Sequence, residues 1–137
     1  FPLQSIKVNS FYGSRVDPFT GKCKQHKGLD LRARYEEVLS MFDGSVKSTG
    51  YDKGSGKFVI LQHGDWTISY CHLSEQYVKT NDYLHAGEPL GLTGNTGAST
   101  GEHLHLTTKK DGKAFDPTIL IDYVRSVKNS CLNDLAF

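Results

Sequence analysis

Residues 57–72 read KFVILQHGDWTISYCH, and this stretch decides the fold class. Two runs rich in β-branched and aromatic residues flank Gly64-Asp65, a pair that is typical of a tight turn, so the stretch predicts a β-hairpin. Closely spaced strands of this kind predict an antiparallel all-β domain. Similar short β-prone runs lie at 44–47, 90–93 and 103–108.

Further signals concern one turn and the end of the chain. Gly54-Ser55-Gly56 predicts a flexible hairpin end. Asp116-Pro117-Thr118 introduces a run with apolar residues near helical spacing, so we expect a short C-terminal helix over about 118–130 that packs on the sheet. The 137 residues fit one compact domain, 1–137, whose apolar core is sufficient for folding without metal or disulfide support.

Composition excludes several classes of partner. The 16 basic and 15 acidic residues leave a net charge of +1, which gives no electrostatic basis for binding nucleic acid or an anionic membrane. No apolar run approaches the roughly 20 residues that span a bilayer. Cys23, Cys71 and Cys131 are too few for a disulfide framework or a cysteine-type zinc site, although a Cys23–Cys131 pair stays open. The chain starts at Phe1 without an initiator methionine, so we expect a processed or trimmed protein.

Three short segments together predict a catalytic zinc site: 26–30 (HKGLD), 70–73 (YCHL) and 101–105 (GEHLH). A hydrolytic zinc site uses three nitrogen or oxygen ligands and keeps a fourth position for water. We expect His26, Asp30 and His105 to be these ligands. One carboxylate and two neutral imidazoles leave the bound ion with a net positive charge, so it stays a strong Lewis acid, whereas several thiolates would favour a closed structural site.

Strand periodicity assigns two more histidines. His103 and His105 lie two residues apart, so they share one face of a strand, with backbones about 6.5 Å apart. One imidazole can then bind the metal while its neighbour reaches a substrate or water on that metal, and we expect His103 to be this neighbour. In residues 66–72 the same period predicts that Cys71 faces a core and His72 a groove.

Other conspicuous residues are expected to lie outside the site. His63 falls at the tip of the hairpin and is expected to be structural, and His85 falls in a loop-like stretch and is expected to be solvated. Trp66 is expected to pack, with recognition of a substrate as the alternative. The charged segment Arg32–Val38 is expected to be a solvated loop.

Six motifs follow one another along the chain: YGSR at 12–15, DPFTG at 17–21, HKGLD at 26–30, FDGSV at 42–46, YCHL at 70–73 and the stretch from GNTG at 94–97 to His105. In this order they resemble the lysostaphin-like, LytM-type zinc metallopeptidases. The resemblance spans roughly residues 11–121. Proteins of that family cut peptide bonds in the stems or cross-bridges of bacterial peptidoglycan, and they have an all-β fold with a long open groove. The resemblance therefore implies an antiparallel sheet sandwich with an open groove, one Zn²⁺ per chain, a peptidoglycan peptide as substrate and an extracytoplasmic location.

The resemblance, carried over by position, makes His26, Asp30 and His105 the metal ligands and His72 and His103 the catalytic histidines. Every one of these positions is filled, which favours an active zinc metalloendopeptidase that uses a metal-activated water. One of His72 and His103 would be the general base and the other would stabilise the oxyanion. The sequence leaves open which histidine has which role.

Two other functions stay open at this point: a non-catalytic wall-binding or amidase-activating module, and a structural β-sandwich with incidental histidines. The chain also departs from the family pattern in one place. Some members have a tyrosine shortly before the first ligand, but this chain has Thr20–Gln25 there, with Tyr12 or Arg15 as candidate substitutes. The scissile bond and the oligomeric state are not specified by the sequence.

Overall fold

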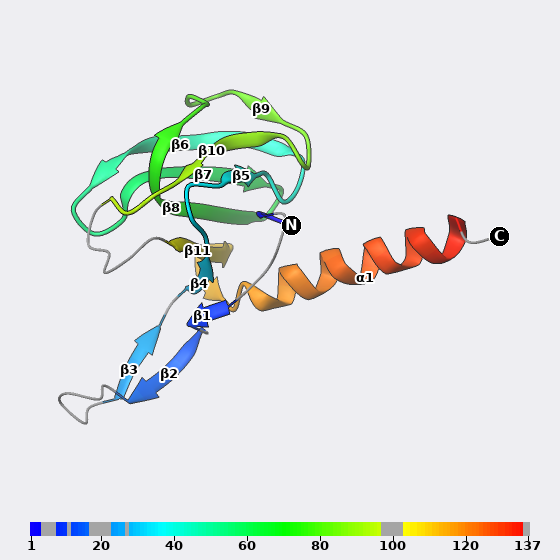
Figure 1. Ribbon diagram of the computed structural model, residues 1–137, viewed down its shortest axis with the longest axis horizontal. Helices are drawn as coiled ribbons and strands as arrows, with labels where there is room; N and C mark the ends of the chain where they lie inside the picture. Colours follow the sequence, from blue (N-terminus) through cyan, green and yellow to red (C-terminus); the bar gives the residue numbers. More distant parts are fainter. Residues whose placement is uncertain (4–7, 11, 17–22, 27, 97–102, 136–137) are drawn as a thin grey trace.

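The computed structural model describes residues 1–3, 8–10, 12–16, 23–26, 28–96 and 103–135. Strands account for most of the regular structure, as Figure 1 shows. Within the described residues the elements are β1 (Val8–Ser10), β2 (Gly13–Val16), β3 (Cys23–His26), β4 (Leu29–Arg32), β5 (Glu37–Leu39), β6 (Gly44–Asp52), β7 (Gly56–His63), β8 (Trp66–Gln76), β9 (Tyr83–Leu84), β10 (Pro89–Thr93), β11 (His103–Lys110), β12 (Lys113–Phe115) and α1 (Thr118–Leu135).

The strands described here form one large sheet and one small ribbon. The large sheet has the order β1-β4-β11-β8-β7-β6-β9, with β10 paired to β5 and β8 and with β12 paired to β11. Every pairing in it is antiparallel. The strands β2 and β3 pair with each other and extend away from the large sheet (Figure 1). The predicted antiparallel all-β class is therefore confirmed.

Both predicted hairpins are present. The strands β7 and β8 are joined by Gly64-Asp65, and Gly64 has a φ of 62°, a left-handed conformation that glycine adopts without steric cost. The strands β6 and β7 meet at the turn around Gly54, and Gly56 follows it with a φ of 65°. The two turns fix the register of the three central strands, and that register places the side chains of the site.

Alternation along the strands separates the sheet into two faces. On β11, Leu104 and Leu106 are fully buried in the core, whereas His103 and His105 lie half-buried on the opposite face. On β4, Leu29 and Leu31 face the core, and their neighbour Asp30 faces the same way as the histidines. Burying this apolar face is the main force that holds the sheet together. The core is built from Leu3, Leu29, Leu31, Ala33, Val38, Met41, Val46, Val59, Leu61, Ile68, Tyr70, Leu73, Leu84, Leu90, Leu104, Leu106, Leu120 and Ile121.

The C-terminal helix begins at Thr118, as predicted, and continues to Leu135, five residues beyond the predicted end at about 130. Leu120 and Ile121 bury its first turns in the core, and most of the helix projects from the sheet (Figure 1). In the part of the chain described here, no helix has both the length and the apolar character needed to cross a membrane.

The expectation for Arg32–Val38 needs a correction. Arg34 and its neighbours to Glu37 are exposed, as expected of a solvated loop, but Ala33 and Val38 at either side of this run are buried in the core. Val38 lies in β5, which pairs with β10. The sequence analysis missed these two core positions, because each is a single apolar residue among polar neighbours.

Candidate metal centre

Three adjacent strands bring the central side chains together. In the antiparallel ladder, His105 of β11 lies opposite Asp30 of β4, and on its other side it lies opposite Cys71 of β8. Asp30, His103 and His105 each offer one ligand atom, and these atoms all lie within 4.8 Å of one another. Residues 75 positions apart in the chain thus form one half-buried polar cluster.

The distances within this cluster are short. Asp30 Oδ1 lies 2.6 Å from Nδ1 of His105, where the ring N–H donates to the carboxylate, and 3.5 Å from Nε2 of His103. A carboxylate and imidazoles are the ligand types of hydrolytic zinc sites, whereas a closed structural site would be rich in thiolates. The donor set present therefore fits a catalytic divalent cation.

Gly28 is a site residue that the sequence analysis missed. A Cβ atom at this position would lie 2.6 Å from Cε1 and 2.7 Å from Nε2 of His105, and 2.6 Å from the carbonyl oxygen of Leu106. These distances are too short for any side chain, so the imidazole of His105 rests directly on the backbone at Gly28. The glycine between the two predicted ligands of the HKGLD segment was the available signal.

His72 reaches the same place through an irregularity in β8. Between Tyr70 and Leu73 this strand advances three residues while β7 advances two, so β8 carries one extra residue. His72 has a φ of 62°, a left-handed conformation that is uncommon for a residue with a side chain. Bulges of this kind turn a side chain out of the regular alternation. The ring centroid of His72 consequently lies 5.0 Å from that of His103 and 5.8 Å from that of His105.

This bulge corrects the expectation for Cys71. Tyr70 is the residue that faces the core, where its hydroxyl accepts a hydrogen bond from the backbone N–H of Met41. Cys71 is buried on the opposite face with His105, and only the bulge lets His72 follow it to that side. Burial raises the pKa of the Cys71 thiol to about 11, although a hydrogen bond with Ser55 opposes the shift. The thiol is therefore protonated at neutral pH.

Hydrogen bonds fix the orientation of the His72 ring. Its Nδ1 lies 2.6 Å from the carbonyl oxygen of Thr96, and because a carbonyl only accepts, Nδ1 carries the proton. The remaining nitrogen, Nε2, is then an acceptor in the neutral ring. The backbone N–H of His72 donates to the carbonyl of Ser55, and the Thr96 hydroxyl donates to that of Leu73. Burial, the largest cause, lowers the pKa of His72, with the Thr96 carbonyl opposing it and His103 and His105 reinforcing it.

A groove runs beside the cluster on the same face of the sheet. Its cavity has a volume of about 240 Å³ and is lined by His105 together with alternate residues of β7, β8 and β11. Charged groups stand in its wall at Asp52 and Lys109. An extended peptide placed in this groove would pass His105 and could hydrogen-bond to groups of both signs.

The other predicted residues fall as follows. His26 ends β3 opposite Gly13, but its side chain lies outside the described part of the structure. His63 and His85 lie apart from the cluster, as expected: Nδ1 of His63 donates to the carbonyl oxygen of Asp43, 2.9 Å away, and His85 is exposed. The side chains of Cys23 and Cys131 are not among those described, and the described Cys71 is a free thiol.

Two remaining expectations concern Trp66 and Arg15. Trp66 packs against the core, with its ring centroid 5.4 Å from that of Phe115, which agrees with the packing role. The Arg15 side chain lies outside the described part of the structure.

Comparisons with known proteins agree with this geometry. Residues 24–117 match the model of peptidase family M23. An uncharacterized metalloprotease of Haemophilus influenzae is 38% identical over 122 residues, which cover 85% of this chain and 26% of the relative. The peptidoglycan DD-endopeptidase ShyC of Vibrio cholerae is 36% identical over 107 residues, which cover 76% of this chain and 25% of that protein. The chain thus spans about a quarter of the curated relatives it matches.

Solved structures resemble the whole fold. A zinc-containing peptidase from Vibrio cholerae superimposes with a TM-score of 0.79 and 27% identity, covering 85% of this chain and 37% of that one. The catalytic domain of lysostaphin from Staphylococcus simulans has a TM-score of 0.74 and 28% identity, covering 88% of this chain and 92% of that one. The sequence match, the sheet and the cluster of histidines with one aspartate thus agree: the chain belongs to peptidase family M23.

Proposed function

We propose that this chain is a zinc-dependent endopeptidase that hydrolyses peptide bonds in the stem peptides or cross-bridges of peptidoglycan, acting as one domain outside the cytoplasm. The observation that carries the proposal is the convergence of Asp30, His103 and His105 from two strands beside the bulged His72. Membership of peptidase family M23 and the similarity to a DD-endopeptidase support the same chemistry.

The proposed ligands are His26, Asp30 and His105, with one Zn²⁺ per chain. The donor atoms of Asp30 and His105 lie next to each other. His26 is the last residue of β3 and lies only two residues before Gly28, against which the His105 ring packs. A second ligand set consists of Asp30, His103 and His105. It has to be tested as well, because among the described residues these three offer ligand atoms that lie close to one another. Zinc content of single variants distinguishes the two sets.

When bound, zinc would lower the pKa of a coordinated water from far above neutral toward roughly 7 and polarise the scissile carbonyl. His72 is suited to be the general base. Its proton is held on Nδ1 by the Thr96 carbonyl, so Nε2 presents its lone pair, and its lowered pKa keeps the ring neutral at pH 7. A neutral imidazole with one free lone pair is the form that accepts a proton.

His103 is left for stabilisation of the oxyanion. Its ring lies next to that of His72, with 5.0 Å between the centroids, so both rings can contact the same group of a bound substrate. A ring N–H donor aimed at the developing negative charge is worth more in the transition state than in the ground state, and it therefore raises the rate of the chemical step.

The peptidase activity is tested by incubating the zinc-loaded chain with purified peptidoglycan and identifying the released peptides by mass spectrometry. We expect fragments with new amino termini, and 1,10-phenanthroline should abolish them until zinc is restored. Walls of different cross-bridge composition then define the scissile bond. A fully zinc-loaded chain that releases no peptide from any wall would refute the peptidase proposal and favour a non-catalytic wall-binding or activating module.

The assignment of roles is tested by zinc content and turnover of single variants. His105→Ala and His26→Ala should lose zinc, whereas His103→Ala should keep it and lose turnover by about 10² or more. His85→Ala is the control, because His85 is exposed and lies apart from the cluster. Loss of zinc from the His103 variant together with its retention in the His26 variant would exchange the two assignments.

A further inference from the structure

A second cavity lies on the face of the sheet opposite to the metal centre. It has a volume of about 490 Å³ and lies between the end of the β7–β8 hairpin and the first turns of α1. Trp66 belongs to the core face, with Ile68 and Tyr70, whereas Ser69 and Cys71 belong to the groove face. Cys71 lies five positions after Trp66 in β8, which corresponds to about 16 Å along the strand. The cavity is thus separate from the catalytic groove.

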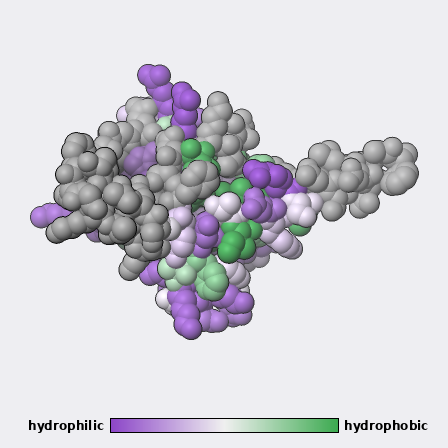
Figure 2. Space-filling model, turned by 90° about the horizontal axis from the view of Figure 1, so that it is seen from below, coloured by the Kyte–Doolittle hydropathy of each residue, from purple (hydrophilic) through white to green (hydrophobic). Residues whose placement is uncertain are grey.

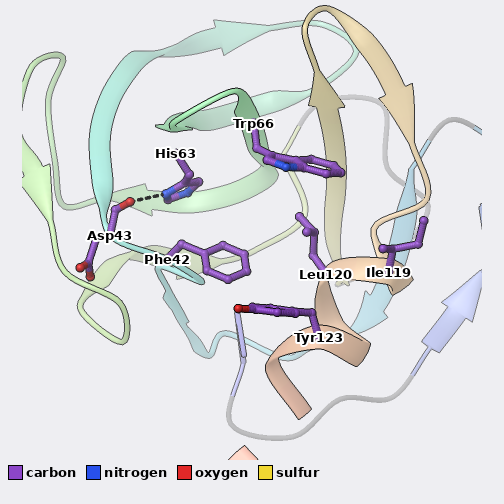
Figure 3. Close-up of a pocket in the computed structure, with 7 residues that line it drawn as sticks. All are labelled: Phe42, Asp43, His63, Trp66, Ile119, Leu120 and Tyr123. Carbon is purple, nitrogen blue, oxygen red and sulfur yellow. Dashed lines mark hydrogen bonds between the residues drawn. The ribbon is translucent and has the colours of Figure 1, made fainter. Parts of the chain in front are cut away.

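Aromatic and aliphatic side chains form the walls of this cavity. Figure 3 shows Trp66 on one side of the space and Tyr123 on the other, with Phe42 and Leu120 between them. The ring centroid of Phe42 lies 5.7 Å from that of His63 and 6.3 Å from that of Tyr123. Flat walls of this kind favour a flat aromatic occupant, because aromatic rings pack edge to face and offset face to face at such distances.

His63 contributes one buried hydrogen-bond acceptor to these otherwise apolar walls. Its Nδ1 donates to the carbonyl oxygen of Asp43, as the dashed line in Figure 3 shows, so Nε2 of the neutral ring is an acceptor. Burial lowers the pKa of His63, which keeps the ring neutral. Nε2 is buried and, among the described residues, has no hydrogen-bond partner. A buried acceptor without a partner destabilises a protein, so a ligand that supplies one N–H or O–H here would remove that cost.

A path to Nε2 requires a small movement of the wall. Since Nε2 is shielded from water, a donor reaches it only after a wall side chain rotates. Tyr123 has the space to do this, because 60% of its surface is exposed. The Tyr123 ring therefore rotates outward to admit the occupant and then packs against it, so it stays part of the wall.

The surface next to the cavity indicates that the occupant is part of a polypeptide. Ile119, Tyr123 and Val127 are spaced four residues apart, so they lie along one side of α1, and they are 52%, 60% and 45% exposed. On the face shown in Figure 2, apolar side chains gather beside the base of the helix among hydrophilic ones. A single small molecule would cover the cavity alone, whereas a polypeptide could also cover this stripe.

We propose that the cavity lined by Phe42, His63, Trp66, Leu120 and Tyr123 binds a tryptophan or tyrosine side chain of a partner polypeptide, whose N–H or O–H donates to Nε2 of His63. The bound partner would leave the catalytic groove open, because the two sites lie on opposite faces of the sheet. This binding is independent of the peptidase activity.

The test compares three probes by chemical-shift titration of the metal-loaded chain: N-acetyltryptophanamide, its 1-methyl derivative without the indole N–H, and indole. We expect N-acetyltryptophanamide to bind with a dissociation constant on the order of 1 mM, as its size allows. It should bind about fivefold or more tightly than the 1-methyl derivative, because only the former donates to His63. His63→Phe keeps an aromatic ring without the acceptor, and it should abolish this difference.

Two variants check the place of binding. Tyr123→Ser should weaken N-acetyltryptophanamide binding at least threefold, whereas Tyr51→Ser, which changes a tyrosine of similar exposure on β6, should leave it unchanged. Equal binding of the methylated and unmethylated probes to the wild-type chain, or no binding of either, would overturn the proposal without relying on any variant. Binding of indole but not of the capped amide would overturn the polypeptide assignment.

Discussion

Gly28 contributes to the metal centre by lacking a side chain. We expect Gly28→Ala to lower zinc affinity by tenfold or more, because the new Cβ would displace the His105 ring, now 2.6 Å from that position. Gly54→Ala is the matched control, since its nearest neighbour, a carboxylate oxygen of Asp52, is 3.5 Å away. Competition with a fluorescent zinc chelator measures both affinities. Unchanged zinc affinity in the Gly28 variant would show that the ring position is not required for binding.

His72 combines the proposed general base with a left-handed backbone conformation, and the effects of these two properties can be separated. A left-handed conformation costs a non-glycine residue about 1–2 kcal/mol. His72→Gly should therefore be more stable than His72→Ala by about 1 kcal/mol in urea unfolding. Both variants should keep zinc and lose turnover by about 10² or more, because neither has the imidazole. A glycine variant no more stable than the alanine variant would contradict the strain at φ 62°.

At the scale of elements, the β6–β7 hairpin and the segment that follows β10 together hold His72. The Thr96 hydroxyl donates to the carbonyl of Leu73 and accepts from the N–H of Lys57. Gly56 lies so close to Thr96 that a Cβ at this position would overlap the Thr96 backbone. This packing aims the Thr96 carbonyl at Nδ1 of His72. Thr96 is thus a positioning residue that acts through the orientation of the ring.

The role of Thr96 is tested with an isosteric change. Thr96→Val removes the hydroxyl and should lower kcat about tenfold, with KM and zinc content nearly unchanged, as is typical when a residue that orients a site side chain is lost. Thr96→Ser should restore most of the activity. The tautomer of His72, read from its ring nitrogens by NMR, should shift away from the Nδ1–H form in the valine variant only. Equal kcat in all three proteins would exclude this positioning role.

The alternation in β8 also determines the reactivity of Cys71. Its pKa is raised from 9.0 to about 11, so at pH 8 the thiolate fraction in the folded chain falls from about a tenth to about a thousandth. Iodoacetamide should therefore alkylate Cys71 roughly 100-fold more slowly in the folded than in the unfolded chain. Peptide mapping by mass spectrometry follows Cys71 separately from the other cysteines. Rapid labelling in the folded state would contradict its burial.

Regular alternation was the part of the fold that the sequence could predict. The hairpin of β7 and β8, the strand β11 and the start of α1 follow from periods and turn residues, and the structure has them where expected. The strand β4 was not predicted, although Leu29 and Leu31 alternate with Asp30. Four residues are too short a pattern to recognise without the neighbouring strands that complete it.

The site was predictable in its residue types but not in its local geometry. Period two places His103 and His105 on one face, and the structure brings both to Asp30. The same rule failed at Cys71, which lies on the groove face. His72 lies on the groove face as expected, but it reaches that face only because a bulge adds a residue to β8, and no glycine marks the left-handed position of this bulge. Bulges depend on the pairing of three strands at once, and this information is absent from a local pattern.

At the scale of the whole molecule, the core should hold the fold without the metal. The buried side chains of the sheet form one continuous apolar cluster that does not include the metal centre. We expect chelation by EDTA to leave the far-UV circular dichroism spectrum unchanged and thermal unfolding cooperative, while zinc raises the Tm by preferential binding to the folded state. Unfolding of the chain by EDTA alone would instead show that folding depends on the metal.

The central claim is that Asp30 and His105 hold a catalytic zinc ion beside His72. An anomalous difference map, recorded at the zinc absorption edge from a crystal of the zinc-loaded chain, tests it most directly. We expect one peak at about 2.0–2.2 Å from a carboxylate oxygen of Asp30 and from a ring nitrogen of His105. His26 should be the third protein ligand, with His72 and His103 near the open position. A zinc peak that contacts neither Asp30 nor His105 would contradict the account.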